Sequence, residues 1–154
     1  MRRLIVNADD FGLTSGVNRG ILRAHEQGIV TSSTLMACSK RFDEAVDLAR
    51  NSPGLSVGCH VVLVDGAPVL APADLPSLIN NGGSEFRQSL MSFAMVAASG
   101  RLESSQVEAE VTAQIKTLQA AGIQVSHLDS HKHTHMFPAV LKGMLRAAKN
   151  CGIR

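Results

Sequence analysis

The sequence has few aromatic residues and no long apolar run. It contains no tryptophan or tyrosine, and its five phenylalanines make up 3% of 154 residues. A cleft that stacks rings on several aromatic side chains is therefore not expected. The longest apolar stretches fall far short of the ~18 residues that span a bilayer, so we expect no membrane association. The amino terminus becomes polar at Asn7, too early for a secretory signal, and a cytoplasmic location is the default expectation.

Cysteine and net charge are also scarce. The three cysteines, Cys38, Cys59 and Cys151, have no paired spacing, which indicates reduced thiols. Cys59 precedes His60 and could add a metal ligand, but neighbours on a strand point to opposite faces, which favours a buried thiol. Fifteen basic and thirteen acidic residues leave a net charge of +2 without a basic run, so no nucleic-acid partner is expected. With 45% hydrophobic residues, residues 1–154 are interpreted as a single globular domain.

Strand-like apolar runs alternate with amphipathic helical patterns along the chain. Strands are predicted over residues 3–8, 29–37, 55–64 and 123–128. Helices are predicted from a cap at Thr14 or Ser15 to Gly28, over 42–49, over 87–98, from a capping box at 105–108 to Gly122, and from Pro138 to Gly152. Residues 65–83 hold three prolines and three glycines and are predicted to be a long loop. This order predicts a parallel sheet, either in an open α/β fold or in a barrel.

The predicted strand ends carry polar side chains that a buried strand does not need. The first apolar run stops at Asp9 and Asp10, the third contains His60, and Asp129 and His131 follow the fourth. Parallel α/β proteins place their sites at the carboxyl edge of the sheet, where these groups would meet. The local alternatives are a solvated loop or a helix cap for the two aspartates, and a satisfied core histidine for His60.

Four of the six histidines fall within residues 127–135, together with one aspartate. If this segment were extended, its five potential ligands would share one face at steps of about 6.6 Å, with the outer two roughly 26 Å apart. At most two neighbours could then reach one ion, and Asp10 and His60 are natural complements from other strand ends. Two imidazoles and one carboxylate suit zinc or a similar divalent ion. The potential ligands in the segment are His127, Asp129, His131, His133 and His135.

Several of these residues have more than one interpretation. Asp129 could orient a ligand histidine or simply end the strand. His133 and His135 could contact substrate, support the ligands, or lie in a solvated loop. Lys132 is interpreted as a solvated charge. Together, the two clusters predict a metal-dependent hydrolase.

Three segments resemble the signature motifs of the YdjC-like carbohydrate deacetylases, a group that includes chitooligosaccharide deacetylases and hopanoid-associated proteins. These segments are residues 7–13, 58–60 and 127–138, and the resemblance runs from residue 2 to the last residue. It implies the N-terminal part of a distorted (β/α) barrel of the TIM type. It also implies one divalent metal ion, zinc or magnesium, on Asp10, His60 and His131, with Asp9 as the catalytic base. The implied reaction removes an acetyl group from a small N-acetylated amino sugar or oligosaccharide.

The chain is shorter than expected from this resemblance, which implies a longer chain with a further histidine-bearing motif. We therefore expect an incomplete barrel: a fragment, a truncated product, or a half-barrel completed by a partner such as a second copy in a homo-oligomer. The general acid would be His133, His135 or a group outside this chain. Two other functions fit the clusters: a metal-dependent phosphoesterase, although no glycine-rich phosphate loop is present, and a non-catalytic metal-binding remnant or subunit.

Overall fold

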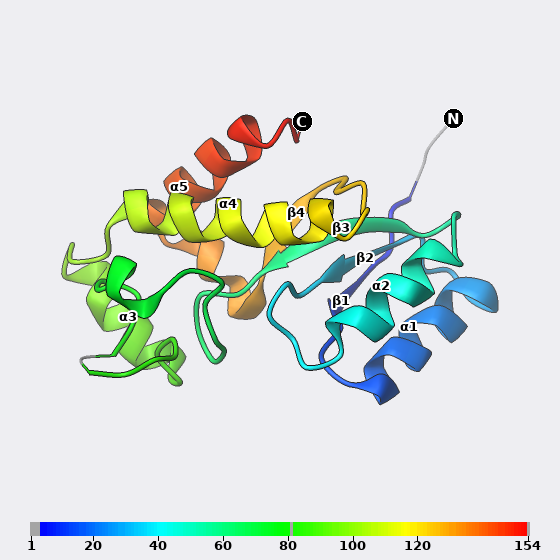
Figure 1. The fold of residues 1–154 in the computed structure, drawn as a ribbon, viewed down its shortest axis with the longest axis horizontal. Helices are drawn as coiled ribbons and strands as arrows, with labels where there is room; N and C mark the ends of the chain where they lie inside the picture. The colour runs from blue at the N-terminus through cyan, green and yellow to red at the C-terminus, as the bar shows by residue number, and fades with distance from the viewer. Residues whose placement is uncertain (1–3, 81, 154) are drawn as a thin grey trace.

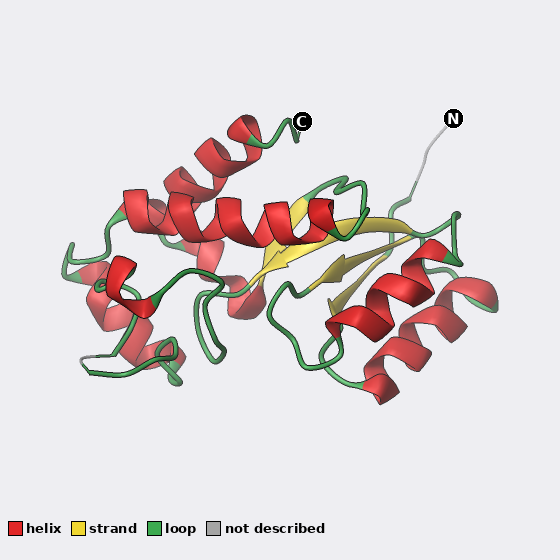
Figure 2. Cartoon of the chain, in the orientation of Figure 1, coloured by secondary structure: helices red, strands yellow, loops and turns green. Residues whose placement is uncertain are grey.

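The computed structural model describes residues 4–80 and 82–153 and shows a four-stranded parallel sheet in the order β1-β2-β3-β4 (Figures 1 and 2). The strands are β1 (Asn7–Phe11), β2 (Ser32–Leu35), β3 (Ser56–Val61) and β4 (Leu128–Ser130). The α-helices are α1 (Ser15–Glu26), α2 (Phe42–Arg50), α3 (Leu90–Ala98), α4 (Ser104–Ala120) and α5 (Pro138–Asn150). Two short 3₁₀ helices are η1 (Pro72–Asp74) and η2 (His131–Met136). The sheet is a curled half-barrel with helices between its strands, which confirms the predicted partial α/β barrel.

The helices cover the sheet in two groups. Helices α1 and α2 pack side by side next to β1 and β2, whereas α4 lies against β3 and α5 (Figure 1). The apolar core includes Leu35 of β2, Val61 of β3 and Ile115 of α4, all fully buried. No helix in the two described ranges is long and apolar enough to cross a membrane.

The first and fourth strands lie further along the chain than predicted. Strand β1 begins at Asn7 and not at Arg3, which is outside the described residues. The apolar pair Leu4 and Ile5, which suggested the earlier start, is 78% and 77% exposed. Strand β4 begins at Leu128 because it pairs with the end of β3. Asp9, Asp10 and Asp129 therefore lie within the strands, whereas His131 directly follows β4.

The predicted helix starts were correct at α1 but not at α4. The Thr14 side chain accepts a hydrogen bond from the backbone N–H of Val17 at 3.1 Å and caps α1. The capping box predicted at 105–108 is wrong, because α4 already begins at Ser104. The N-cap residue is Glu103, and its side chain makes no capping hydrogen bond. Of the predicted loop, residues 65–80, 82 and 83 are described; they are irregular apart from η1 and one isolated bridge at Ile79, in agreement with the prediction.

A buried polar pair on α4 holds the segment that follows β3. The carboxylate of Glu110 accepts hydrogen bonds from the N–H groups of Val69 and Leu70, at 2.9 and 3.0 Å, and from the Gln114 amide at 2.8 Å. Gln114 in turn bonds both the N–H and the carbonyl of Val62, at 3.0 and 2.7 Å. These bonds satisfy buried polar groups and fix the path of the chain as it leaves the sheet.

Candidate metal centre

An irregularity in β1 separates its two aspartates. Ala8 pairs with Ser33 and Phe11 with Leu35, so two residues of β1, Asp9 and Asp10, lie opposite one residue of β2. This extra residue is a β-bulge, and bulges redirect side chains next to functional sites. Asp10 has a positive φ of 64°, a conformation that aspartate tolerates better than most residues.

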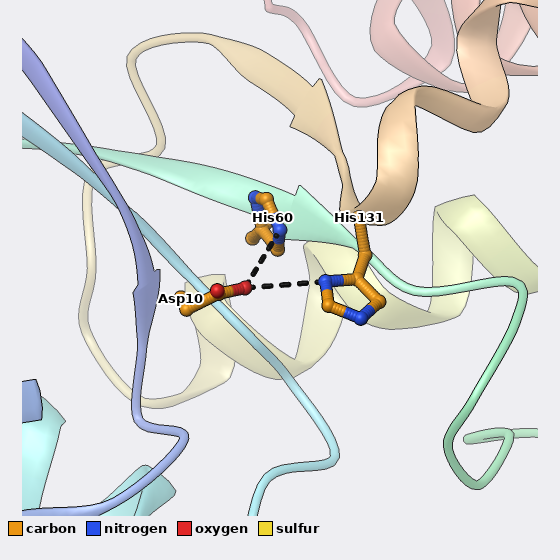
Figure 3. Close-up of side chains that lie close together, drawn as sticks. All are labelled: Asp10, His60 and His131. Carbon is orange, nitrogen blue, oxygen red and sulfur yellow. Dashed lines mark hydrogen bonds and ion pairs between the residues drawn. The ribbon is translucent and has the colours of Figure 1, made fainter.

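Asp10, His60 and His131 meet at the carboxyl edge of the sheet (Figure 3). They come from β1, β3 and the first position of η2. One oxygen of Asp10, Oδ1, lies 3.1 Å from His60 Nε2 and 3.2 Å from His131 Nδ1. The ligand-type atoms of the three residues all lie within 4.8 Å of one another. This geometry allows one small cation to be shared by all three.

His60 presents a free nitrogen to this group. Its Nδ1 lies 2.6 Å from Asp129 Oδ1, directly across the β3–β4 pairing. Its Nε2 is buried and, among the described residues, has no partner in hydrogen-bonding geometry despite the nearby Asp10 oxygen. A neutral imidazole that donates from Nδ1 carries its lone pair on Nε2, the form that binds a metal ion. The orphaned nitrogen therefore fits a divalent cation.

The charges around the two histidines explain the directions of their pKa shifts. Burial alone would lower the pKa of His60, but the hydrogen bond and charge of Asp129, with the charges of Asp10 and Asp9, raise it overall. Burial lowers the pKa of His131 even though the charge of Asp10 opposes this shift. The electrostatic field that stabilises a proton on His60 also favours a bound cation.

The chain turns sharply after His131, so residues 127–135 do not form the continuous extended segment that the sequence analysis considered. Lys132 and His133 both have positive φ values, 52° and 54°, at the start of η2. Lys132 forms an ion pair with Asp65, which follows β3, and is not simply solvated. The turn leaves His131 in the group of potential ligands and directs the following residues elsewhere.

A second group of potential ligands shares His60. The ligand-type atoms of Asp9, His60 and Asp129 also lie within 4.8 Å of one another. These carboxylates already accept hydrogen bonds: Asp9 Oδ1 from Asn7 at 2.8 Å, and Asp129 Oδ2 from Thr34 at 2.8 Å. Both groups include His60, but Asp129 faces its Nδ1, whereas Asp10 lies 3.1 Å from the unpartnered Nε2. The Asp10 group is therefore the better candidate for a cation.

The remaining histidines of the cluster lie outside both groups. His127 contacts Asn7 Oδ1 through Nε2 at 3.2 Å, and Ser130 Oγ lies 2.7 Å from His135 Nδ1. The rings of His133 and His135 pack edge to face, 5.9 Å apart. Cys59 is fully buried, as the strand alternation favoured.

Thr34 is a site residue that the sequence analysis missed. Its hydroxyl bonds to the Asp129 carboxylate behind His60. The only local signal was a run of four hydroxyl residues, Thr31 to Thr34, of which the last three lie in β2, a strand that is buried throughout.

Comparison with known proteins places this chain in a family. The family described as YdjC-like protein matches residues 3–154. The chain belongs to the YdjC-like family. It is 43% identical over 147 residues to a carbohydrate deacetylase from Brevibacillus brevis, covering 96% of this chain and 56% of the relative. It is 44% identical to a carbohydrate deacetylase from Halalkalibacterium halodurans, covering 96% of this chain and 60% of that relative.

Solved structures show the same fold. A protein from Enterococcus faecalis, described as a candidate cellobiose-phosphate cleavage protein, superposes with a TM-score of 0.84 at 34% identity, covering 97% of this chain and 56% of that one. A lactam utilization protein from Thermus thermophilus, at 19% identity and a TM-score of 0.50, shares the fold alone. The chain thus spans little more than half the length of the YdjC-like relatives it matches.

Proposed function

We propose that this chain carries the metal-binding part of a metal-dependent carbohydrate deacetylase. Asp10, His60 and His131 would hold one divalent ion, and Asp9 would act as the catalytic base. The observation that carries the proposal is the buried, unpartnered Nε2 of His60 facing the same Asp10 oxygen that His131 faces. The names of the relatives, at up to 44% identity, support removal of an acetyl group from a carbohydrate.

The ligand set guides the choice of metal. Two imidazoles and one carboxylate suit zinc, whereas magnesium prefers oxygen ligands. Zinc is therefore the first ion to test and magnesium the second. Three protein ligands leave coordination positions open for water and substrate.

The residues around the site can divide the work of amide hydrolysis. A divalent ion held there would lower the pKa of a water molecule and polarise the substrate's amide carbonyl. Asp9 lies next to Asp10 but outside the proposed ligand set, and its carboxylate can accept the proton of the attacking water. The departing amine needs a proton donor, for which His133 and His135 are the candidates in this chain.

The names of the relatives support a small carbohydrate as the substrate class, and the loops at the carboxyl edge enclose a cavity of suitable size. A cavity of about 480 Å³ lies at the carboxyl edge and is lined by residues that follow β1, β2 and β3. Its size falls within the range of small-molecule sites. Its lining combines the apolar Leu13 and Met36 with the polar Lys40 and Gln88.

The test measures metal retention and acetate release separately. Elemental analysis of the purified protein should find about one divalent ion per chain, retained in Asp9→Asn and lost in Asp10→Asn and His60→Ala. Asn suits position 10 because it tolerates the positive φ. The exposed Asp74→Asn is the matched control and should keep the ion. Acetate release from N-acetylated chito-oligosaccharides should stop in Asp9→Asn.

Three results would overturn the proposal. Loss of the ion in Asp9→Asn together with its retention in His60→Ala would reverse the assigned roles. Retention of the ion without acetate release from any amino sugar would instead favour a non-catalytic metal-binding subunit. A phosphorylated disaccharide is assayed in parallel, because the solved relative from Enterococcus faecalis is described as acting on cellobiose-phosphate; release of phosphate alone would favour the phosphoesterase alternative.

A further inference from the structure

A line of hydrogen bonds runs behind His60 and involves side chains from all four strands. Thr34 of β2 is at its centre and is fully buried. Its Oγ1 lies 2.8 Å from Asp129 Oδ2, 3.2 Å from His60 Nδ1 and 3.3 Å from the side-chain nitrogen of Asn7. Thr34 lies opposite the β1 bulge, because Ser33 and Leu35 pair with the residues that flank the two aspartates. Among the described residues, none of its hydrogen bonds is to Asp10 or His131.

The chemistry of these groups gives the line one direction. The Asn7 amide nitrogen can only donate, so the Thr34 oxygen accepts from it. The carboxylate of Asp129 can only accept when ionised, so the Thr34 hydroxyl proton points to Asp129. The other oxygen of Asp129 then receives the Nδ1–H of His60 at 2.6 Å.

The consequence for His60 is the choice of tautomer. With the proton on Nδ1, the lone pair is on Nε2, the atom that faces Asp10 (Figure 3). The opposite tautomer would place a proton on Nε2 and set two acceptors, Nδ1 and the carboxylate, against each other at 2.6 Å. Asp129 enforces the first tautomer only while its carboxylate keeps its orientation. The bonds to its Oδ2 come from Thr34 at 2.8 Å and from the more exposed Asn7 at 3.3 Å, so Thr34 has the larger part.

We propose that Thr34 is a positioning residue that, through Asp129, fixes the tautomer of His60 and thereby the affinity of the site for a divalent ion. This inference rests on the proposed metal site and extends it to a residue that no ion would touch. Groups that orient a ligand histidine in this way typically change metal affinity by 10–100-fold when they are removed.

The experiment compares three threonine variants by zinc affinity, measured in competition with a chromophoric chelator. Thr34→Val keeps the shape of the side chain and removes the hydroxyl, and Thr34→Ser restores the hydroxyl. Thr117→Val makes the same change on α4 and is the matched control, because within the described ranges the Thr117 hydroxyl bonds only to the carbonyl of Ala113 in its own helix. We expect Thr34→Val to weaken zinc binding by at least about tenfold, and Thr34→Ser and Thr117→Val by less than about threefold.

Two further measurements separate positioning from general destabilisation. Thermal unfolding of the metal-free proteins reports the structural cost of each variant. The ¹⁵N NMR signals of the His60 ring, recorded at alkaline pH where imidazole is neutral, report the tautomer directly. We expect protonated Nδ1 in the metal-free wild-type protein and in Thr34→Ser, and a mixture of tautomers in Thr34→Val.

The outcomes distinguish this inference from the proposed function. If wild-type protein binds zinc and Thr34→Val binds it equally well, the inference is overturned and the metal site stands. Equal loss of affinity in Thr34→Val and Thr34→Ser would also overturn it, because the hydroxyl would then not be the cause. If wild-type protein retains no divalent ion, the proposed function fails and this inference fails with it.

Discussion

The substitution Glu110→Gln tests how strongly the long segment after β3 is held. Glu110 is fully buried, and its two oxygens receive three N–H groups: Val69 and Gln114 at Oε1, and Leu70 at Oε2. Glutamine has almost the same shape but only one acceptor oxygen. If that oxygen replaces Oε1, the new amide nitrogen faces the N–H of Leu70, and two donors oppose each other without a partner.

The expected loss follows from these contacts. A hydrogen bond to a charged group contributes about 1.5–3 kcal/mol, and a buried polar group left without a partner costs about 1–3 kcal/mol. The two remaining bonds weaken because their acceptor becomes neutral. We therefore expect the free energy of unfolding to fall by about 2–4 kcal/mol in Glu110→Gln.

Urea denaturation followed by far-UV circular dichroism measures this loss, since the chain has no tryptophan or tyrosine to report by fluorescence. Glu108→Gln, on the same helix, is the matched control. Glu108 lies 3.6 Å from the half-exposed Arg146 and accepts one bond from Asn150, so its substitution should cost less than about 1 kcal/mol. Equal losses in the two variants would refute the assignment of Glu110 as the anchor of residues 69–70.

Two other predictions concern β3. A Cβ atom at Gly58 would lie 2.7 Å from the carbonyl oxygen of His127 and 2.8 Å from its ring, so Gly58→Ala should lower the free energy of unfolding by about 1–3 kcal/mol in the same denaturation assay. An unchanged urea midpoint would contradict the close packing of His127, which precedes β4, against Gly58 of β3. Burial raises the pKa of both thiols, that of Cys38 to about 11, but Cys38 is exposed and Cys59 is fully buried. Iodoacetamide should therefore modify Cys38 in the folded protein and Cys59 only after unfolding, as read by peptide mass spectrometry. Equal labelling rates at the two positions would show that β3 is not packed as described.

The order of strands and helices was predictable because apolar periodicity depends on local sequence. The limits of β1 and β4 were not, because they are set by pairing with a neighbouring strand. Leu4 and Ile5 have strand-like side chains but lie before β1 and are largely exposed. Asp129 is polar, yet it belongs to β4 because it pairs with His60 of β3. In both segments, tertiary pairing overrides the local apolar pattern.

The candidate site was predictable as a set of residue types but not as a geometry. Asp10, His60 and His131 were expected at one edge of the sheet, and the structure brings them together there; their role as metal ligands stays a prediction. The bulge has no glycine or proline signal in the sequence. Thr34 was hidden for a different reason: threonine is common in strands, so its residue type alone does not separate a positioning role from ordinary strand propensity.

The extra residue in β1 also limits how this segment can change in length. Asp9 and Asp10 are the only residues between Ala8 and Phe11, so removing one would delete a carboxylate and restore one-to-one pairing with β2, and the aspartate that remains would lose the orientation that the bulge gives it. Substitutions can therefore alter the two carboxylates one at a time, whereas a deletion or insertion here would disable both together. In a mutational library of this strand, some substitutions should be tolerated, whereas insertions and deletions, which move side chains to the opposite face of the sheet, should not.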